Sequence, residues 1–180
     1  MRRDKATYGD LVAVTGHLGC SAAGLRIIKE NLSFPSDAEK HFTQTHFRPL
    51  PRIELGLSLA KQGIECAMDV SDGLLNDLSK ICTASNVSAT VSVSDLPVHE
   101  KLQSCFPNIW DQLAVGGGED YELLFTIPKN LIHKISQHSD VEFKIIGEIT
   151  EGSRGVTIIG PTGKSMDYST GGWDHFREHA

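Results

Sequence analysis

Two carboxylates and a hydroxyl lie close together in the run Asp69-Val70-Ser71-Asp72-Gly73. An apolar segment precedes this run and leucines at helical spacing follow it, which predicts a strand that ends here and a helix that begins near Gly73. Mg²⁺ prefers oxygen ligands and usually takes one or two carboxylates together with phosphate oxygens and water. The first turn of a helix also offers free N–H groups to an anion. The run is therefore a candidate magnesium and phosphate site, although from these five residues alone Ser71 or Asp72 as a plain helix N-cap is the simpler explanation.

A second acidic run follows three glycines at positions 116–118 and leads into an apolar strand. Its acidic members are Glu119, Asp120 and Glu122. Glycines let a backbone approach a ligand closely, and the three carboxylates suit a metal ion or a cationic ring. The alternative is a flexible turn with solvated charges, but acidic residues are unfavourable beside a strand.

A third group of residues lies near the end of the chain, in the run Gly171-Gly172-Trp173-Asp174-His175-Phe176. A tryptophan flanked by glycines can stack on a flat heteroaromatic ring. It can equally anchor the end of the chain to the domain. From this run alone, both interpretations stay open.

Composition narrows the classes of partner. The chain has 180 residues, which suits one domain, and its formal net charge is −6. It has no broad positive field, so we expect neither nucleic acid nor an anionic membrane as a partner. No signal-peptide pattern opens the chain and no apolar run reaches the length of a membrane span, so we expect a cytoplasmic protein.

Several common site motifs are missing from the sequence. The nucleotide-binding patterns GxxxxGK[ST] and GxGxxG do not occur, and neither does the GxSxG pattern of a serine nucleophile. The four cysteines show no zinc-finger spacing, and we expect four buried free thiols in a reducing compartment. They are Cys20, Cys66, Cys82 and Cys105.

The elements that must position these residues alternate irregularly along the chain. Apolar runs predict strands at 11–15, 66–70, 89–94, 122–127, 143–149 and 156–159, and helical spacing predicts helices at 21–31, 39–45, 53–62, 73–85 and 131–138. This order favours an α+β fold with a mixed β-sheet flanked by helices.

Together, the three runs resemble the second half of thiamine-monophosphate kinases in order and spacing. The segments that carry the resemblance are Asp69 to Leu74, Gly117 to Phe125, and Gly172 to Phe176, supported by Gly9-Asp10, Val14 to Gly16, Gly19 to Leu25 and Arg48 to Arg52. The run GGEDYELLF combined with the terminal GWDHF is specific to this kinase. The earlier motifs are shared with its superfamily, which includes aminoimidazole-ribonucleotide synthetase, selenophosphate synthetase and a hydrogenase-maturation protein.

The resemblance implies a fold like the C-terminal domain of aminoimidazole-ribonucleotide synthetase. It also implies direct in-line phosphoryl transfer from ATP to thiamine monophosphate, with Mg²⁺ as the metal and without a protein nucleophile, so that no residue is expected to be covalently catalytic. The site residues implied are Asp69 and Asp72 for Mg²⁺, Ser71 and Arg3 for ATP, and Glu119 and Trp173 for thiamine monophosphate.

The resemblance also implies a missing half. Residues 1–10 correspond to the end of an interdomain linker and 11–180 to the C-terminal substrate- and nucleotide-binding domain. The family's amino-terminal domain, which carries further metal ligands and the main dimer interface, is not in this sequence. We therefore expect the isolated chain to be monomeric, with little or no kinase activity. Two alternatives remain: another ATP-dependent member of the superfamily, or a non-catalytic domain that binds a phosphorylated ligand.

Overall fold

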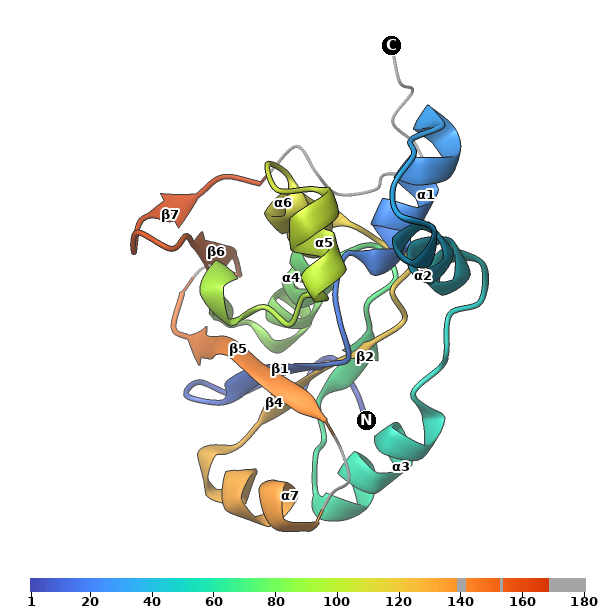
Figure 1. The fold of residues 1–180 in the computed structure, drawn as a ribbon. Helices are drawn as coiled ribbons and strands as arrows, with labels where there is room; N and C mark the ends of the chain where they lie inside the picture. Colours follow the sequence, from blue (N-terminus) through green and yellow to red (C-terminus); the bar gives the residue numbers. More distant parts are fainter. Residues whose placement is uncertain (139–141, 153, 169–180) are drawn as a thin grey trace.

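A computed structural model describes residues 1–138, 142–152 and 154–168, which fold around one seven-stranded sheet (Figure 1). The strand order is β2-β4-β1-β5-β3-β6-β7, and every neighbouring pair is antiparallel except β3 and β6. The strands are β1 (Leu11–Thr15), β2 (Ala67–Asp69), β3 (Ser88–Ser92), β4 (Leu123–Ile127), β5 (Phe143–Thr150), β6 (Val156–Ile159) and β7 (Ser165–Met166). The predicted mixed sheet is confirmed.

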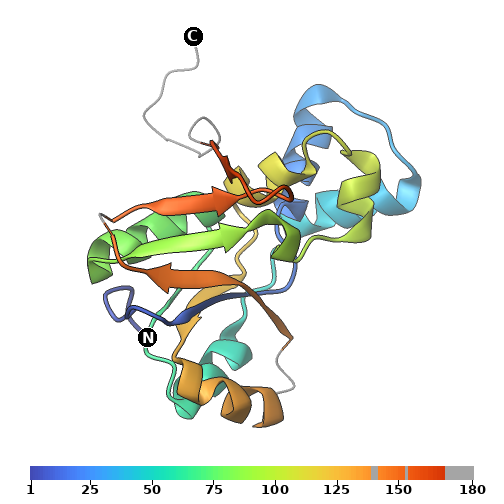
Figure 2. The ribbon, with the colours of Figure 1, turned by 90° about the vertical axis from the view of Figure 1, so that its left-hand side faces the viewer.

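Helices cover both faces of the sheet and one of its ends (Figures 1 and 2). They are α1 (Cys20–Glu30), α2 (Ser36–Phe47), α3 (Ile53–Gln62), α4 (Leu74–Ser85), α5 (Glu100–Cys105), α6 (Trp110–Gly116) and α7 (Ile132–His138), with short 3₁₀ turns η1 (Val93–Asp95) and η2 (Lys129–Leu131). Among the residues described, no helix combines the length and apolarity that a membrane span requires.

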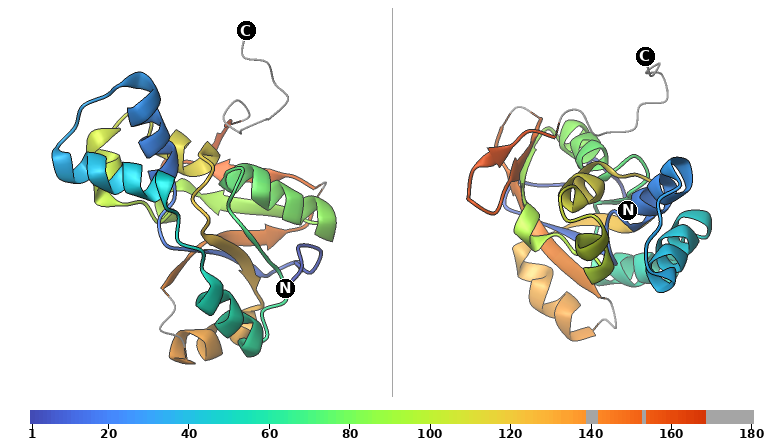
Figure 3. Two further views of the ribbon diagram at one scale, coloured as in Figure 1. Left: turned by 90° about the vertical axis from the view of Figure 1, so that its right-hand side faces the viewer. Right: turned by 45° about the horizontal axis from the view of Figure 1, so that its top comes forward.

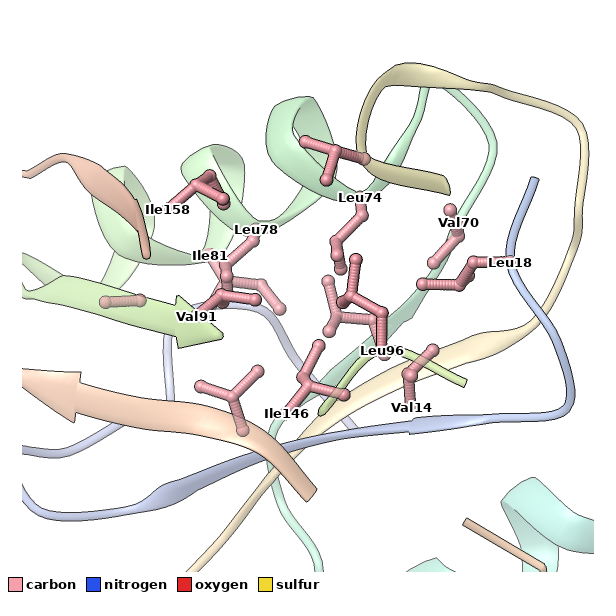
Figure 4. Close-up of a cluster of buried hydrophobic side chains, with 14 of the residues drawn as sticks. Val14, Leu18, Val70, Leu74, Leu78, Ile81, Val91, Leu96, Ile146 and Ile158 are labelled. Atoms are coloured by element: carbon pink, nitrogen blue, oxygen red, sulfur yellow. The ribbon is translucent and has the colours of Figure 1, made fainter. Parts of the chain in front are cut away.

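Alternation along the central strands divides the core into two faces. Val12 and Val14 of β1 belong to one buried cluster, whereas Ala13 between them belongs to another. This is the period of two that a strand buried on both faces must show. The larger cluster lies under α4 and α6, and Figure 4 shows Leu74, Leu78 and Ile81 of α4 directed toward Val91 and Ile146 of the sheet.

Two smaller clusters of buried hydrophobic residues pack the remaining helices against the rest of the domain. Helices α3 and α7 cover the opposite face of the sheet around Leu59, Phe125 and Ile135. A third cluster joins α1, α2 and α5 around Phe42 and Leu102. Helices α1 and α2 lie side by side at one end of the sheet, away from α3 and α7 (Figure 3).

Most predicted elements are present, and the exceptions have physical causes. Helices α5 and α6 were not predicted, because segments of six and seven residues are too short for helical periodicity to stand out. The alternation predicted through residue 94 ends at Ser92, where the 3₁₀ turn η1 begins. The prediction of four buried cysteines was wrong for Cys105, which is only partly buried.

Candidate metal and nucleotide site

The first two acidic runs, far apart in the sequence, are hydrogen-bonded to each other in the fold. The segment that leaves β2 and the segment that enters β4 continue the pairing of these two strands beyond their ends. The amide of Glu119 donates to the carbonyl of Ser71 at 2.9 Å, and the amide of Tyr121 donates to the carbonyl of Val70 at 2.9 Å. In the other direction, the amide of Val70 donates to the carbonyl of Glu122 at 2.8 Å. The backbone thereby fixes one acidic run against the other.

The glycines of these segments let the two backbones touch. A Cβ atom on Gly118 would lie 2.5 Å from the carbonyl oxygen of Ser71, and one on Gly73 would lie 2.8 Å from the carbonyl oxygen of Gly116. Gly73 also has a φ of 103°, which disfavours any residue with a side chain. The sequence predicts glycines that approach a ligand; these two instead allow the acidic segments to approach each other.

Three of the predicted site residues act electrostatically on the hydroxyl of Tyr121. The Tyr121 hydroxyl donates a hydrogen bond to Oε2 of Glu119 at 3.3 Å. The negative charge of Glu119 is the largest cause of a raised pKa for the Tyr121 hydroxyl, and the charges of Asp69 and Asp72 add to it. Negative charge from several carboxylates in one region favours a bound cation.

A further acidic residue, Asp77, fixes the backbone of the first run through hydrogen bonds. Its side chain is fully buried, and Oδ2 accepts hydrogen bonds from the backbone amides of Ser71 and Asp72, each at 2.9 Å. Lys80, one turn further along α4, contacts both Asp72 and Asp77, the latter at 2.7 Å. Neither residue was among the predicted site residues. Their three-residue spacing on the helix was the available signal.

The N-cap interpretation of the first run is wrong. Gly73 is the N-cap of α4, and no side chain makes a capping hydrogen bond there. The side chain of Asp77, inside the first turn, reaches back to the preceding loop instead. Asp69 is exposed and Asp72 is partly exposed, so both carboxylates remain accessible from solvent.

Arg3 lies on the same side of the molecule as the first run. It lines a shallow hollow of about 550 Å³ together with Met68 and Asp69. It also lines a neighbouring hollow of about 390 Å³ together with Ser79 and Lys80. Two cationic side chains therefore adjoin the exposed carboxylates. Trp173, the predicted stacking residue, lies outside the described residues.

Asp120 has a structural role rather than a ligand-binding one. Its Oδ2 accepts a hydrogen bond from the amide of Gly19 at 2.7 Å, and its Oδ1 accepts one from the amide of Ser21 at 3.0 Å. These amides lie at the start of α1, so Asp120 supplies the cap that the helix lacks from its own N-cap residue. Burial raises the pKa of Asp120 to about 7, against the lowering effect of the two amides.

Glu122 is also satisfied within the protein. Its two oxygens accept hydrogen bonds from Arg52 at 2.6 and 2.7 Å, and Oε2 accepts another from the Thr15 hydroxyl at 2.6 Å. Gly16, with a φ of 56°, makes room for this carboxylate, because a Cβ there would lie 1.9 Å from it. Of the three carboxylates in the second run, only Glu119 is therefore available to a ligand.

The carboxylates fit part of a magnesium site. Among the residues that the structure describes, no group of three or more His, Cys, Asp or Glu side chains is arranged to enclose a metal ion. Mg²⁺ does not require such an enclosure, since it commonly uses one or two carboxylates and completes its shell with phosphate oxygens and water. Asp69 and Asp72 could supply that share, and the charge that raises the pKa of Tyr121 would be offset by the ion.

The chain is similar to several known proteins in sequence and in fold. The chain is 39% identical to a thiamine-monophosphate kinase of Haemophilus influenzae and 36% identical to that of Escherichia coli K12, over 98% of this chain and 55% of each relative. A solved structure described as AaThiL complexed with AMPPCP and TMP matches with a TM-score of 0.81 and 33% identity, over 97% of this chain and 53% of that one. The thiamine-monophosphate kinase of Stenotrophomonas maltophilia matches with a TM-score of 0.78 and 34% identity, over 92% of this chain and 54% of that one.

The chain spans about half the length of the curated relatives it matches. A hydrogenase-maturation complex, HypE–HypF, matches with a TM-score of 0.72 at 22% identity, which shows a shared fold. The family model described as AIR synthase related protein, C-terminal domain, matches residues 7–160. The chain therefore belongs to the AIR synthase related proteins and contains their C-terminal domain.

Proposed function

We propose that this chain forms the C-terminal half of an ATP-dependent thiamine-monophosphate kinase. The observation that carries the proposal is the backbone hydrogen bonding between the two acidic segments, whose residues Asp69, Asp72 and Glu119 all raise the pKa of the Tyr121 hydroxyl. The relatives that match the chain are named for this activity, and one related structure is described as a complex with AMPPCP and TMP.

Each group at the site has a task in this proposal. Asp69 and Asp72 hold Mg²⁺, which supplies charge neutralisation between the acidic surface and the phosphates. Arg3 contacts the phosphates of ATP, as does Ser71, whose backbone Asp77 holds in place. Glu119 lies where it can attract the cationic thiazolium ring of thiamine monophosphate.

The reaction transfers the terminal phosphoryl group of ATP to a phosphate oxygen of thiamine monophosphate. The products are ADP and thiamine diphosphate, and no bond to the protein forms. Such a transfer requires alignment of the two phosphates and stabilisation of their charge, rather than a protein nucleophile. Trp173 is proposed to stack on the substrate ring.

Full kinase activity in this proposal also requires the half of the relatives' length that this chain does not span. We expect the 180 residues alone to bind ligands but to turn over little, because the remaining metal and nucleotide contacts belong to that other half. The two halves together are proposed to act as a homodimer in the cytoplasm, whereas the isolated chain is proposed to be a monomer.

Titration calorimetry of the chain tests this function. We expect binding of ATP that depends on Mg²⁺, and binding of thiamine monophosphate that weakens about tenfold in Glu119→Gln. Asp69→Asn and Asp72→Asn should abolish the dependence on Mg²⁺. Asp37→Asn is the matched control, because Asp37 is an exposed aspartate of α2 that pairs with Lys101 of α5.

Turnover decides between a kinase half and a binding module. Addition of the amino-terminal half of a relative should restore formation of thiamine diphosphate, and the Asp72→Asn variant should not respond. Ligand binding without any restored turnover would favour a binding module. Absence of binding for both ATP and thiamine monophosphate would refute the proposal.

A further inference from the structure

Helix α3 is apolar on the side that faces solvent as well as on the side that faces the core. Leu59 is fully buried in the cluster shared with α7 and the sheet, and Leu55 packs against the same cluster. On the opposite side, Ile53 is 66% exposed, Leu57 is 59% exposed, and Ala60 is exposed as well. The spacing of these three residues, here called the α3 stripe, places them on one face of the helix. Apolar faces of helices are normally covered, and this one is bare.

Exposed apolar side chains are concentrated around this stripe. Among the residues that the structure describes, eight large hydrophobic side chains are exposed, and four of them lie between positions 47 and 57. Besides Ile53 and Leu57, these are Phe47 at the end of α2 and Leu50 in the segment that joins the two helices. That segment and α3 lie on the side that faces the viewer in the left view of Figure 3. Single exposed apolar residues are common, but such a concentration marks an interaction surface.

The first residues of the chain adjoin the α3 stripe. A Cβ atom on Gly56, which lies within the span of the stripe, would be 3.6 Å from the Cε atom of Met1. The amide of Arg2 donates to the carbonyl of Glu65 at 2.7 Å, so the first residues run beside the segment that enters β2. Met1 also lines the hollow of about 550 Å³ that includes Asp69. The start of the chain therefore lies between the stripe and a proposed magnesium ligand.

We propose that the α3 stripe is the docking surface for the part of the kinase that precedes this chain in its relatives. The inference rests on the proposed function, because it takes this chain as the C-terminal half. The chain matches 55% of each relative, so a second part of comparable size remains to be placed. That part would join at Met1, beside the stripe. When seated on the stripe, it would also reach the hollow that Asp69 lines.

The chemistry of the stripe specifies the surface that faces it. The centre is aliphatic and has no side-chain group that forms hydrogen bonds, whereas the exposed residues Glu54 and Lys61 lie along one edge. An apolar centre with a charged rim is typical of an interface between protein domains. We therefore expect the partner to present aliphatic or aromatic side chains at the centre and polar ones around them. A second copy of this chain is the competing occupant, but the position of Met1 favours the preceding part.

Hydroxyl-radical footprinting tests the surface, because it measures the solvent exposure of individual side chains. The chain alone is compared with a fusion in which the amino-terminal half of the Haemophilus influenzae relative precedes Met1. Labelling of Ile53 and Leu57 should fall at least about fivefold in the fusion, since the core of an interface excludes water. Labelling of Ile28, an exposed isoleucine of α1, should not change. Equal labelling of the α3 stripe in the two proteins would overturn the proposal.

Turnover of the fusion is measured separately, as formation of thiamine diphosphate from ATP and thiamine monophosphate. Protection of the stripe without turnover would support the docking surface and count against the kinase function. Turnover without protection would support the function and overturn the docking surface. The two proposals can therefore fail independently.

Substitutions on two helices locate the contact. Leu57→Glu places a charge in the α3 stripe, so in the fusion it should return the labelling of Ile53 to the level of the chain alone. Ile28→Glu is the matched control and should leave Ile53 protected. Both variants of the chain alone should keep the unfolding midpoint of the unsubstituted chain, because both side chains are exposed.

Two outcomes of these variants would overturn the proposal. One is continued protection of Ile53 in the fusion that carries Leu57→Glu. The other is a dimer of the chain alone, detected by sedimentation and dissociated by Leu57→Glu, together with an unprotected stripe in the fusion. That second result would assign the stripe to another copy of the chain.

Discussion

The carboxylate of Asp120 accepts a hydrogen bond at 2.7 Å from the amide of Gly19, which precedes it by 101 positions. The same carboxylate accepts a second bond at 3.0 Å from the amide of Ser21. The start of α1 is therefore capped by the segment that leads into β4. This contact connects the α1–α2 pair with the loops of the candidate site. The pKa of Asp120, about 7, lies within the pH range in which the folded protein can be studied.

Asp120 should make stability depend on pH. Its pKa is about 7 in the folded protein, against 3.8 for an ordinary aspartate, because the side chain is buried. Between these values the folded protein keeps a proton that the unfolded chain has released. The free energy of unfolding should therefore fall as pH rises from about 4 to about 7, by at most about 1.4 kcal/mol per pH unit.

The Asp120→Asn variant isolates this effect. Urea denaturation at about pH 5 and about pH 7.5 should show that the variant lacks the part of the fall in unfolding free energy that Asp120 causes as pH rises. The variant should also be destabilised at about pH 5 by about 1–3 kcal/mol, because an amide can accept only one of the two hydrogen bonds. Parallel pH profiles for the two proteins would contradict the assignment.

Arg52 should contribute more to stability than a surface arginine does. It makes two hydrogen bonds to Glu122, whose side chain is only 8% exposed, so Arg52→Gln leaves a buried carboxylate without its counter-charge. We expect a loss of about 2 kcal/mol in the free energy of unfolding. Arg26→Gln breaks an exposed pair with Glu30 and should cost less than about 1 kcal/mol. Equal losses in chemical denaturation would contradict this ranking.

Gly118 should tolerate no side chain. A Cβ there would lie 2.5 Å from the carbonyl oxygen of Ser71, so Gly118→Ala must separate the two acidic segments. We expect a destabilisation of about 1–3 kcal/mol and weaker binding of ATP with Mg²⁺ in calorimetry. Gly155→Ala, where a Cβ would meet nothing within 4 Å, is the control and should leave both unchanged. Full binding by Gly118→Ala would show that the contact between the segments is unimportant.

Lys80 should weaken the binding of divalent cations by the chain alone. Its ammonium group contacts Asp72, a proposed magnesium ligand, and repels a second cation there. We expect Lys80→Met to bind Mn²⁺ roughly tenfold more tightly in an electron paramagnetic resonance titration. The variant should still fold, because Asp77 keeps the amides of Ser71 and Asp72 as partners.

Two further substitutions control this measurement. Lys101→Met breaks a lysine–aspartate pair with Asp37, far along the chain from the acidic runs, and should leave Mn²⁺ affinity unchanged. Asp72→Asn should weaken binding whether or not Lys80 is present. An unchanged affinity in Lys80→Met would show that the ammonium group does not compete with the ion.

Periodicity made most of the fold predictable. Strand β1 and helix α3 were predicted with the bounds that the structure has, since both combine a clear apolar pattern with turn residues at their ends. The short helices α5 and α6 were not, because six or seven residues hold too few turns to show a period. Asp77 and Lys80 were missed for a related reason: polar residues inside a helix resemble an ordinary solvated face.

The local order of residues along the chain determined the elements, the two acidic runs and the family. Only the tertiary structure decided which carboxylates stay available: Glu119 accepts a hydrogen bond only from the exposed hydroxyl of Tyr121 among the described residues, whereas Asp120 caps α1 and Glu122 pairs with Arg52. Glu119 and Tyr121 have positive φ angles of 67° and 53°, so the second run is an irregular turn before β4, and the partners of its side chains come from distant parts of the chain. Sequence spacing alone does not specify which distant groups meet a given carboxylate, because packing of the whole sheet and its helices sets those distances.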